Sequence, residues 1–193
     1  MSRPEVIAVT GGIGSGKSVV CHVLRAMGFP VYDCDSRARR LQDSDPLMRR
    51  RIAEEVTPEA QNPDGSLNRA AIARCVFADS DKLCRLNGIV HGAVAADLTA
   101  EIAACRTPFF FVETAILYES GLDRIVDSVW EVTAPEELRI NRVMARNGLS
   151  ADEVKARIAS QHPAGSNSSH YIIINDGETP VLPRILDELT RRI

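Results

Sequence analysis

The sequence predicts an α/β fold in which five parallel strands form a doubly wound sheet. Short apolar runs rich in β-branched and aromatic residues alternate with stretches of helical periodicity, and this alternation is typical of parallel sheets with right-handed crossovers. A glycine-rich segment joins the first run to the first helical stretch. The apolar runs comprise residues 6–10, 29–33, 108–112, 127–132 and 171–174.

The composition is that of an ordinary globular protein. Of the 193 residues, 45% are hydrophobic and 25% are charged, and the net charge of −3 argues against binding to nucleic acid or to an anionic membrane. No apolar run approaches the roughly 20 residues of a membrane span, and no signal-peptide pattern is present. The five cysteines include no Cys-x-x-Cys pair, which argues against disulfides and a zinc site. We expect a cytoplasmic protein, and a monomer or weak homo-oligomer.

Residues 11–18 fit the phosphate-binding pattern Gly-x-x-x-x-Gly-Lys-Ser/Thr, between an expected strand and an expected helix that stops at Gly28. Glycines let consecutive N–H groups turn toward phosphate oxygens, and the helix N-terminus adds its positive dipole. We expect Lys17 to reach the β- and γ-phosphates and the Ser18 hydroxyl to hold Mg²⁺. A glycine-rich turn that binds nothing is the alternative. The expected nucleotide ligands are Gly12, Ile13, Gly14, Ser15, Gly16, Lys17, Ser18 and Val19.

Acidic residues follow the second and third apolar runs. Ligands lie at the carboxyl ends of strands in open α/β sheets, so Asp33 is placed to face the acceptor of the phosphoryl group. A helix N-cap is the alternative for Asp33, although that role suits Asp35 better. Glu113 is a second candidate for orienting Mg²⁺ or the acceptor, with a cap for the turn at 114–120 as its alternative. Glu119, one turn later, is expected to point toward the acceptor.

Residues 36–105 lack a predicted strand and are too many for a plain crossover helix. Helical periodicity at 36–42, 46–55, 69–77 and 81–105, with a proline-containing loop at 57–68, predicts a helical substrate-binding insertion over about residues 40–105. His91 has Gly88 and Gly92 on either side, so the close approach of a ligand or a neighbouring helix is expected there. A histidine that is simply packed or exposed is the alternative.

A helical pair at residues 135–147 and 151–161 follows the fourth apolar run, where small kinases carry a mobile lid. Arg139, Arg142 and Arg146 share one face of the first helix and could clamp triphosphate oxygens. A solvated basic face is the alternative. We expect a helical lid over about residues 135–163. Asn175 begins an Asn-Asp-Gly turn that borders the adenine or has only the role of a turn.

Together these residues resemble the dephospho-CoA kinase family of P-loop small-molecule kinases. The glycine loop at 10–18 looks like the opening of that family, and the resemblance runs from about residue 6 to 190. Asp33-Cys34-Asp35 resembles its Asp-Ala-Asp, residues 86–91 resemble its Leu-Asn-x-x-x-His, and residues 116–119 resemble its Leu-Leu-Phe-Glu. Arg142 and Arg146 fall on its lid arginines, Gln161 on a helix-ending glutamine, and Asn175 on its Asn-x-Gly. Departures occur at Gly92, Glu113, Ala115, Arg139 and residues 166–168.

The resemblance implies one P-loop kinase domain over residues 1–193 that uses ATP and Mg²⁺. It would transfer the γ-phosphoryl group to the ribose 3′-hydroxyl of dephospho-CoA, the last step of coenzyme A synthesis. Asp33, Lys17 and Arg142 would be catalytic, Arg146 and Asn175 would bind ATP, and Asp33, His91 and Glu119 would bind the acceptor. The alternatives are a nucleoside monophosphate kinase or another small-molecule kinase, and a nucleotide-dependent switch. A switch predicts a guanine-reading Asn-Lys-x-Asp motif, which does not occur in the sequence.

Overall fold

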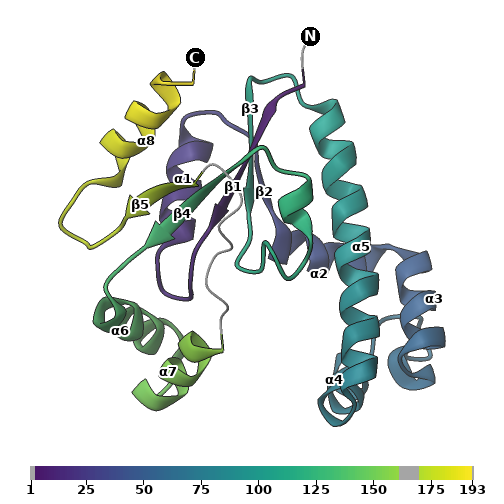
Figure 1. The fold of residues 1–193 in the computed structure, drawn as a ribbon. Helices are drawn as coiled ribbons and strands as arrows, with labels where there is room; N and C mark the ends of the chain where they lie inside the picture. The colour runs from purple at the N-terminus through teal and green to yellow at the C-terminus, as the bar shows by residue number, and fades with distance from the viewer. Residues whose placement is uncertain (1–2, 161–169, 193) are drawn as a thin grey trace. The chain divides into compact units, whose positions relative to one another are not determined.

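The computed structural model describes residues 3–160 and 170–192 of the chain (Figure 1). The chain divides into two units. The sheet unit comprises Met1–Tyr32 and Cys105–Ile193, and the helical unit comprises Asp33–Ala104. The helical unit therefore interrupts the sheet unit in the sequence, in the region where an insertion over about residues 40–105 was expected. That this insertion binds an acceptor stays a prediction.

Among the described residues, the strands form a five-stranded sheet in the spatial order β2-β3-β1-β4-β5. The central strand β1 pairs in parallel with β3 and β4, and β4 pairs in parallel with β5. Residues 6–10 of β1 are all buried, which explains their unbroken apolar run. The predicted parallel α/β sheet is confirmed, with small shifts at the strand ends. The strands are β1 (Glu5–Thr10), β2 (Val31–Asp33), β3 (Phe109–Glu113), β4 (Ser128–Thr133) and β5 (His170–Ile174).

Helices α1 and α8 share the main core with the sheet. In that core the Trp130 ring of β4 lies 5.3 Å from Phe111 and 5.9 Å from Tyr171 between ring centroids. Helices α6 and α7 follow β4, as expected for the predicted lid, and are held together by a smaller cluster around Val143 and Val154. The helices of the sheet unit are α1 (Lys17–Ala26), α6 (Glu136–Asn147), α7 (Ala151–Ala159) and α8 (Val181–Thr190), with a 3-10 turn η2 (Leu122–Arg124).

The helical unit has its own core of apolar side chains, centred on Ile52, Ile72 and Ile89. Its longest helix, α5, packs against the other three helices of the unit. The predicted helices are all present, and the predicted loop at 57–68 also contains a 3-10 turn and a bridge between Gln61 and Leu67. The elements are α2 (Cys34–Ser44), α3 (Pro46–Glu55), η1 (Pro58–Ala60), α4 (Arg69–Ala78) and α5 (Ser80–Ala104).

Over the ranges 3–160 and 170–192, none of the helices combines the length and hydropathy needed to cross a bilayer. Gln161, residues 166–168 and the end of the predicted lid lie outside the described residues.

Candidate active site

The glycine-rich loop joins β1 to α1, and two of its glycines are required by the backbone and its neighbours. Gly14 has φ +77° and Gly16 has φ +91°, a region that side chains other than glycine rarely adopt. A Cβ atom at Gly14 would lie 2.5 Å from the Arg139 carbonyl oxygen, and one at Gly16 would lie 2.0 Å from Nδ2 of Asn175. The loop is therefore pressed against α6 and against the segment that follows β5.

The start of α1 presents the groups that bind phosphates. Gly16 is the N-cap of α1, and no side-chain cap covers this helix N-terminus, which is the kind of position that binds anions. The Lys17 ammonium donates to the carbonyl oxygens of Gly11 at 2.6 Å and Gly12 at 3.3 Å. Ser18 and Val19 follow on the first turn, and both are exposed. The loop thus combines the N-terminus of a helix, a cation and an accessible hydroxyl.

Two of the three arginines predicted on one helix face contact this loop. Arg139 donates through Nε to the Ile13 carbonyl at 2.9 Å. One Arg142 nitrogen donates to the carbonyls of Gly14, Ser15 and Asn175 at 3.4, 3.5 and 3.1 Å. All of these acceptors are neutral, and phosphate oxygens are stronger acceptors for a guanidinium. Arg139 and Arg142 therefore contact the glycine-rich loop. The alternative, in which the basic face of α6 is wholly solvated, is wrong for these two residues.

Arg146 differs from the other two arginines of α6. Its side chain is exposed, and its Nε donates to the neighbouring Asn147 at 2.7 Å. The predicted contact between Arg146 and ATP stays a prediction.

Asn175 links the loop to the sheet. The residue is 8% exposed, its Nδ2 donates to the Ser15 carbonyl at 3.0 Å, and its backbone N–H donates to the Thr133 carbonyl at 2.8 Å. Because its amide hydrogen-bonds to the loop backbone, Asn175 stabilises the loop. The contact with adenine that the sequence suggested stays a prediction. Ser15, which it holds, is 1% exposed, and its hydroxyl has no hydrogen-bond partner among the described residues.

The turn after Asn175 is fixed by Asp176. Its carboxylate accepts from the backbone N–H groups of Glu178 and Thr179 at 3.0 and 2.8 Å. These backbone hydrogen bonds, first that of Thr179, lower the pKa of Asp176. The turn expected at this position is present.

The acids after β3 have other partners. Glu113 is the last residue of β3, and its carboxylate lies 3.3 Å from the Arg25 guanidinium of α1. The following turn is capped by the Thr114 hydroxyl, which accepts from Ile116 N–H at 3.2 Å, so this bond does not fall to Glu113 as the alternative suggested. Glu119 is exposed in the same turn. Metal binding by Glu113 and acceptor binding by Glu119 stay predictions.

Asp33 belongs to the helical unit and ends β2. It is the N-cap of α2, because one carboxylate oxygen accepts from the backbone N–H groups of Asp35 and Ser36, both at 3.1 Å, and the other from the Ser36 hydroxyl at 2.6 Å. The expectation that the cap role suits Asp35 better is therefore wrong. Capping does not exclude the predicted chemistry, and the role of Asp33 as a general base stays a prediction.

His91 lies half-buried on α5 of the same unit. Apart from the chain neighbours and the nearby backbone of α5 itself, no described atom lies within 4 Å of a Cβ placed at Gly88 or Gly92. The described residues therefore show no close neighbouring helix at these glycines. Ligand approach at His91 stays a prediction, and a histidine that is simply packed or exposed stays the alternative.

The described residues contain no group of three or more His, Cys, Asp or Glu side chains that could hold a metal ion. Magnesium in nucleotide sites needs no such group, because it keeps several waters and binds one or two protein oxygens together with phosphates. The exposed Ser18 hydroxyl at the start of α1 fits this role.

Comparison with known proteins agrees with the site. The family model described as "Dephospho-CoA kinase" matches residues 5–180. Dephospho-CoA kinase from Bacteroides fragilis is 38% identical over 185 residues, covering 94% of this chain and 89% of that protein. The relative from Chlorobaculum tepidum is 37% identical over 199 residues, covering 98% of this chain and 92% of that protein.

Among solved structures, TT1252 from Thermus thermophilus superposes with a TM-score of 0.81 at 35% identity, covering 100% of this chain and 99% of that one. Dephospho-CoA kinase from Campylobacter jejuni superposes with a TM-score of 0.66 at 22% identity, covering 96% and 97%, which is a likeness of fold alone. With the glycine loop, its two arginines and the matching family model on one chain, the resemblance seen in the sequence is confirmed, and the protein belongs to the dephospho-CoA kinase family.

Proposed function

We propose that this protein transfers the γ-phosphoryl group of ATP to the ribose 3′-hydroxyl of dephospho-CoA, the final step of coenzyme A synthesis. One observation carries the proposal furthest. Two cations from different elements, Lys17 of α1 and Arg142 of α6, both donate to carbonyls of the same glycine loop. Charge on a transferring phosphoryl group is stabilised by such preplaced donors.

The nucleotide side of the reaction is assigned to the sheet unit. Backbone N–H groups of the loop and of α1 would bind phosphate oxygens, and Lys17 would turn from the loop carbonyls to the β- and γ-phosphates. Arg142 would exchange its neutral acceptors for phosphate oxygens. Arg146 and Asn175 are proposed as further ATP contacts. Mg²⁺, held by the Ser18 hydroxyl with Glu113 as a further candidate, would neutralise phosphate charge.

The acceptor side is assigned to Asp33, His91 and Glu119. Asp33 ends β2, and the carboxyl ends of strands carry the ligand-facing groups in sheets of this class. Its carboxylate would accept the proton of the 3′-hydroxyl as that oxygen attacks the γ-phosphorus. His91 and Glu119 would orient the acceptor. Helices α6 and α7 would act as a lid, because a site open to water would hydrolyse ATP.

We further propose that the protein works in the cytoplasm as a monomer or weak homo-oligomer. All five cysteines are free, which suits a reducing compartment.

The test is ATP consumption by the purified protein with and without dephospho-CoA, followed by the Asp33→Asn variant. Turnover should fall roughly 10²–10⁴-fold, the usual cost of losing a general base, while ATP binding stays near normal. Asp45→Asn is the matched control, because Asp45 caps α3 of the same unit through Leu47 N–H at 2.8 Å and Met48 N–H at 3.2 Å.

Equal turnover in the two variants would show that Asp33 is not the general base and serves only as the N-cap of α2. A panel of nucleoside monophosphates and sugar-type metabolites tests the alternative of another acceptor. A preference for one of these over dephospho-CoA would overturn the proposed function.

A further inference from the structure

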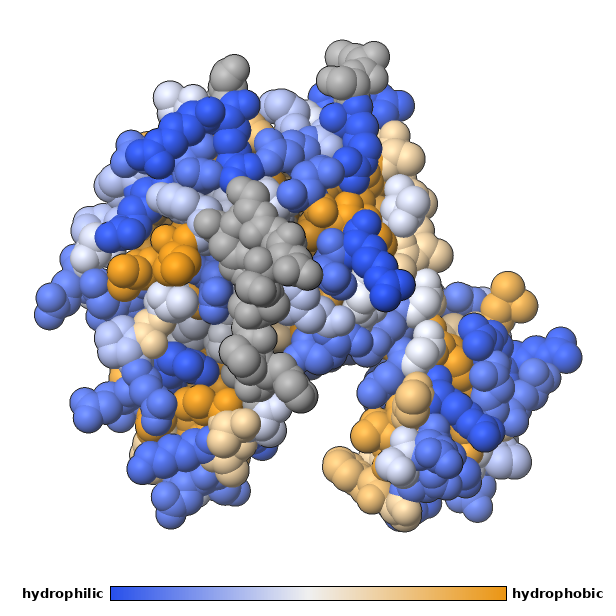
Figure 2. Space-filling view, in the orientation of Figure 1, coloured by the Kyte–Doolittle hydropathy of each residue, from blue (hydrophilic) through white to orange (hydrophobic). Residues whose placement is uncertain are grey.

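Helices α6 and α7 have a small apolar core of their own, and one side chain in it comes from the phosphate loop. The buried members of this core are Ile140, Val143 and Val154. Figure 2 shows hydrophobic surface over the part of the molecule that α6 and α7 form. The Ile13 side chain of the glycine-rich loop packs against this core. The other partly buried members belong to α6, α7 or the turn between them and are Met144, Leu149, Ala151 and Ile158.

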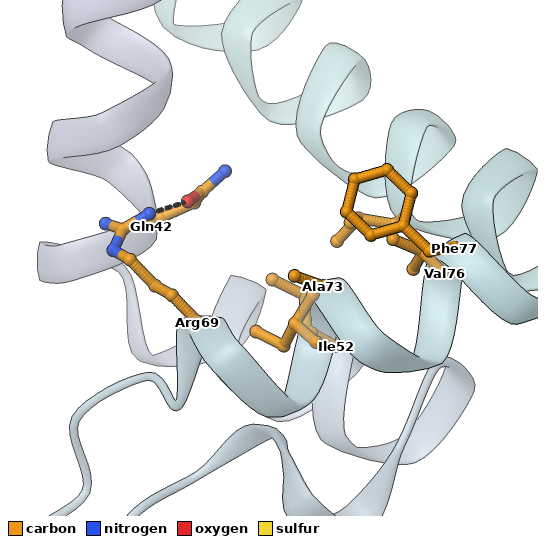
Figure 3. Close-up of a pocket in the computed structure, with 8 residues that line it drawn as sticks. Gln42, Ile52, Arg69, Ala73, Val76 and Phe77 are labelled. Carbon is orange, nitrogen blue, oxygen red and sulfur yellow. Dashed lines mark hydrogen bonds between the residues drawn. The ribbon is translucent and has the colours of Figure 1, made fainter.

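The cavity of the helical unit provides a contrast (Figure 3). It measures about 250 Å³, and the residues described as lining it all belong to helices of that unit. Gln42, Ile52, Val76 and Phe77 are among them. The α6–α7 core differs, because part of its packing is supplied by a loop that binds phosphates in the proposed function.

Arg139 holds the same part of the loop through its side chain and its backbone. Its Nε donates to the Ile13 carbonyl at 2.9 Å. Its own backbone carbonyl oxygen would lie 2.5 Å from a Cβ atom at Gly14, so the loop backbone approaches α6 closely at this point. Apolar packing, a hydrogen bond and a close backbone contact therefore fix residues 13 and 14 of the loop against α6.

Arg142 also contacts the loop, but through bonds that would be given up during the reaction. One of its nitrogens donates to the carbonyls of Gly14, Ser15 and Asn175. In the proposed function the guanidinium leaves these neutral acceptors for phosphate oxygens, which are stronger acceptors. The contacts of Ile13 and Arg139 require no such exchange. They would therefore keep α6 on the loop while Arg142 changes partners.

We propose that the Ile13 side chain and Arg139 are positioning groups that hold Arg142 at the transferring phosphoryl group. This inference rests on the function proposed above. Arg142 follows Arg139 by three residues on α6, which is nearly one turn along the same face and about 4.5 Å along the helix axis. The turn of α6 that is fixed to the loop thus sets the distance from Arg142 to the phosphates.

Positioning of this kind matters because electrostatic stabilisation depends on preorganised donors. A displacement of about 1 Å in a group that acts on the reacting atoms can cost roughly 10²-fold in rate. Arginine has a long side chain with several rotatable bonds, so its own backbone must be held firmly if the guanidinium is to meet one phosphoryl group. The Ile13 side chain and Arg139 would thus act on the reaction through Arg142.

Two variants, each combined with Arg142→Ala, test the proposal. Ile13→Ala removes the apolar contact but keeps the backbone N–H and carbonyl groups of the loop. Arg139→Met keeps most of the aliphatic stem but removes the donor to the Ile13 carbonyl. Met144→Ala is the matched control, because Met144 packs in the same core from α6 itself and alanine suits a helix. Steady-state kinetics measure kcat, KM for ATP and KM for dephospho-CoA.

We expect Ile13→Ala and Arg139→Met each to lower kcat about tenfold, as the loss of about two buried methylene groups or of one hydrogen bond from a charged donor predicts. In the Arg142→Ala background the same changes should lower kcat by less than about twofold, because no guanidinium is left to position. KM for dephospho-CoA should stay at its wild-type value. Ile13→Val should restore most of kcat, and Met144→Ala should keep it.

The possible failures are distinguishable. A wild-type protein that transfers no phosphoryl group to dephospho-CoA overturns the proposed function and this inference with it. An active wild type whose Arg142→Ala variant keeps full kcat overturns the role of Arg142 and this inference.

Equal losses of kcat with and without Arg142 overturn the positioning role alone and indicate that Ile13 and Arg139 act on the nucleotide directly. A loss in Met144→Ala as large as that in Ile13→Ala also overturns it, because the stability of the α6–α7 core would then account for the effect. If Ile13→Ala does not fold, Arg139→Met and its combination with Arg142→Ala decide.

Discussion

Replacing Gly16 by alanine tests how the glycine loop is built. The residue has φ +91°, so a side chain there costs roughly 1–2 kcal/mol in backbone strain. The new Cβ would also lie 2.0 Å from Nδ2 of Asn175, which must then leave the Ser15 carbonyl it contacts at 3.0 Å. Losing a buried hydrogen bond costs roughly 1–3 kcal/mol. We expect Gly16→Ala to lower the free energy of unfolding by about 2–5 kcal/mol.

A double-mutant cycle with Asn175→Ala separates the two contributions. The single variant Asn175→Ala should cost about 1–3 kcal/mol, because it removes the same bond to Ser15. In the double variant this bond is lost only once, and the collision with the amide is gone. The double variant should therefore be less destabilised than the sum of the two single variants, by about 1–3 kcal/mol.

Urea unfolding of the four proteins measures these energies, and nucleotide affinity reports on the loop. Gly28→Ala is the matched control, since Gly28 has φ +88° and a Cβ there meets nothing within 4 Å. It should show only the backbone strain. Additivity of the two single variants within about 0.5 kcal/mol would refute the contact between Asn175 and the loop as the cause.

Three further predictions concern single side chains. Lys17→Ala should severely weaken ATP binding or turnover, measured by nucleotide titration and steady-state kinetics, and full activity would contradict the phosphate role of the loop. Arg142→Ala should lower kcat by roughly 10²–10³-fold with little change in KM for dephospho-CoA, whereas a change confined to that KM would place Arg142 in the acceptor site. Asp176→Asn should destabilise the protein at neutral pH. Because backbone N–H groups lower the pKa of Asp176 in the folded state, its charge stabilises the fold above the unfolded pKa of about 3.9, and this contribution is lost as pH falls through the folded pKa. The melting-temperature difference from wild type should therefore shrink below about pH 4, and a pH-independent difference would contradict this account.

Local patterns predicted much of the fold. The apolar runs identified the strands, because a strand that is buried on both faces, such as β1, consists of consecutive apolar residues. Residues 11–18 identified the phosphate loop, because all the residues of that motif are contiguous in the sequence. The ends of elements were less certain. Asp33 and Asp35 are both plausible caps in the sequence, and only the point at which the backbone turns into α2 selects Asp33.

Helical periodicity placed Arg139, Arg142 and Arg146 on one face but did not say which of them reaches the loop. The sequence signal for Arg139 was its spacing of three from Arg142, yet its contact with Ile13 was missed because the two lie 126 positions apart. The sequence did not indicate that Arg25, 88 positions away, lies beside Glu113, and metal binding by Glu113 stays a prediction.

By itself, then, the sequence determined the alternation of strands and helices, the phosphate loop and the family, since these depend on neighbouring residues and their spacing. Only the tertiary structure decided how Asn175 supports the loop from 160 positions away. It also decided that Gln42, Arg69 and Phe77 line one cavity. Contacts of this kind depend on side-chain packing between distant segments, which periodicity along the chain does not encode.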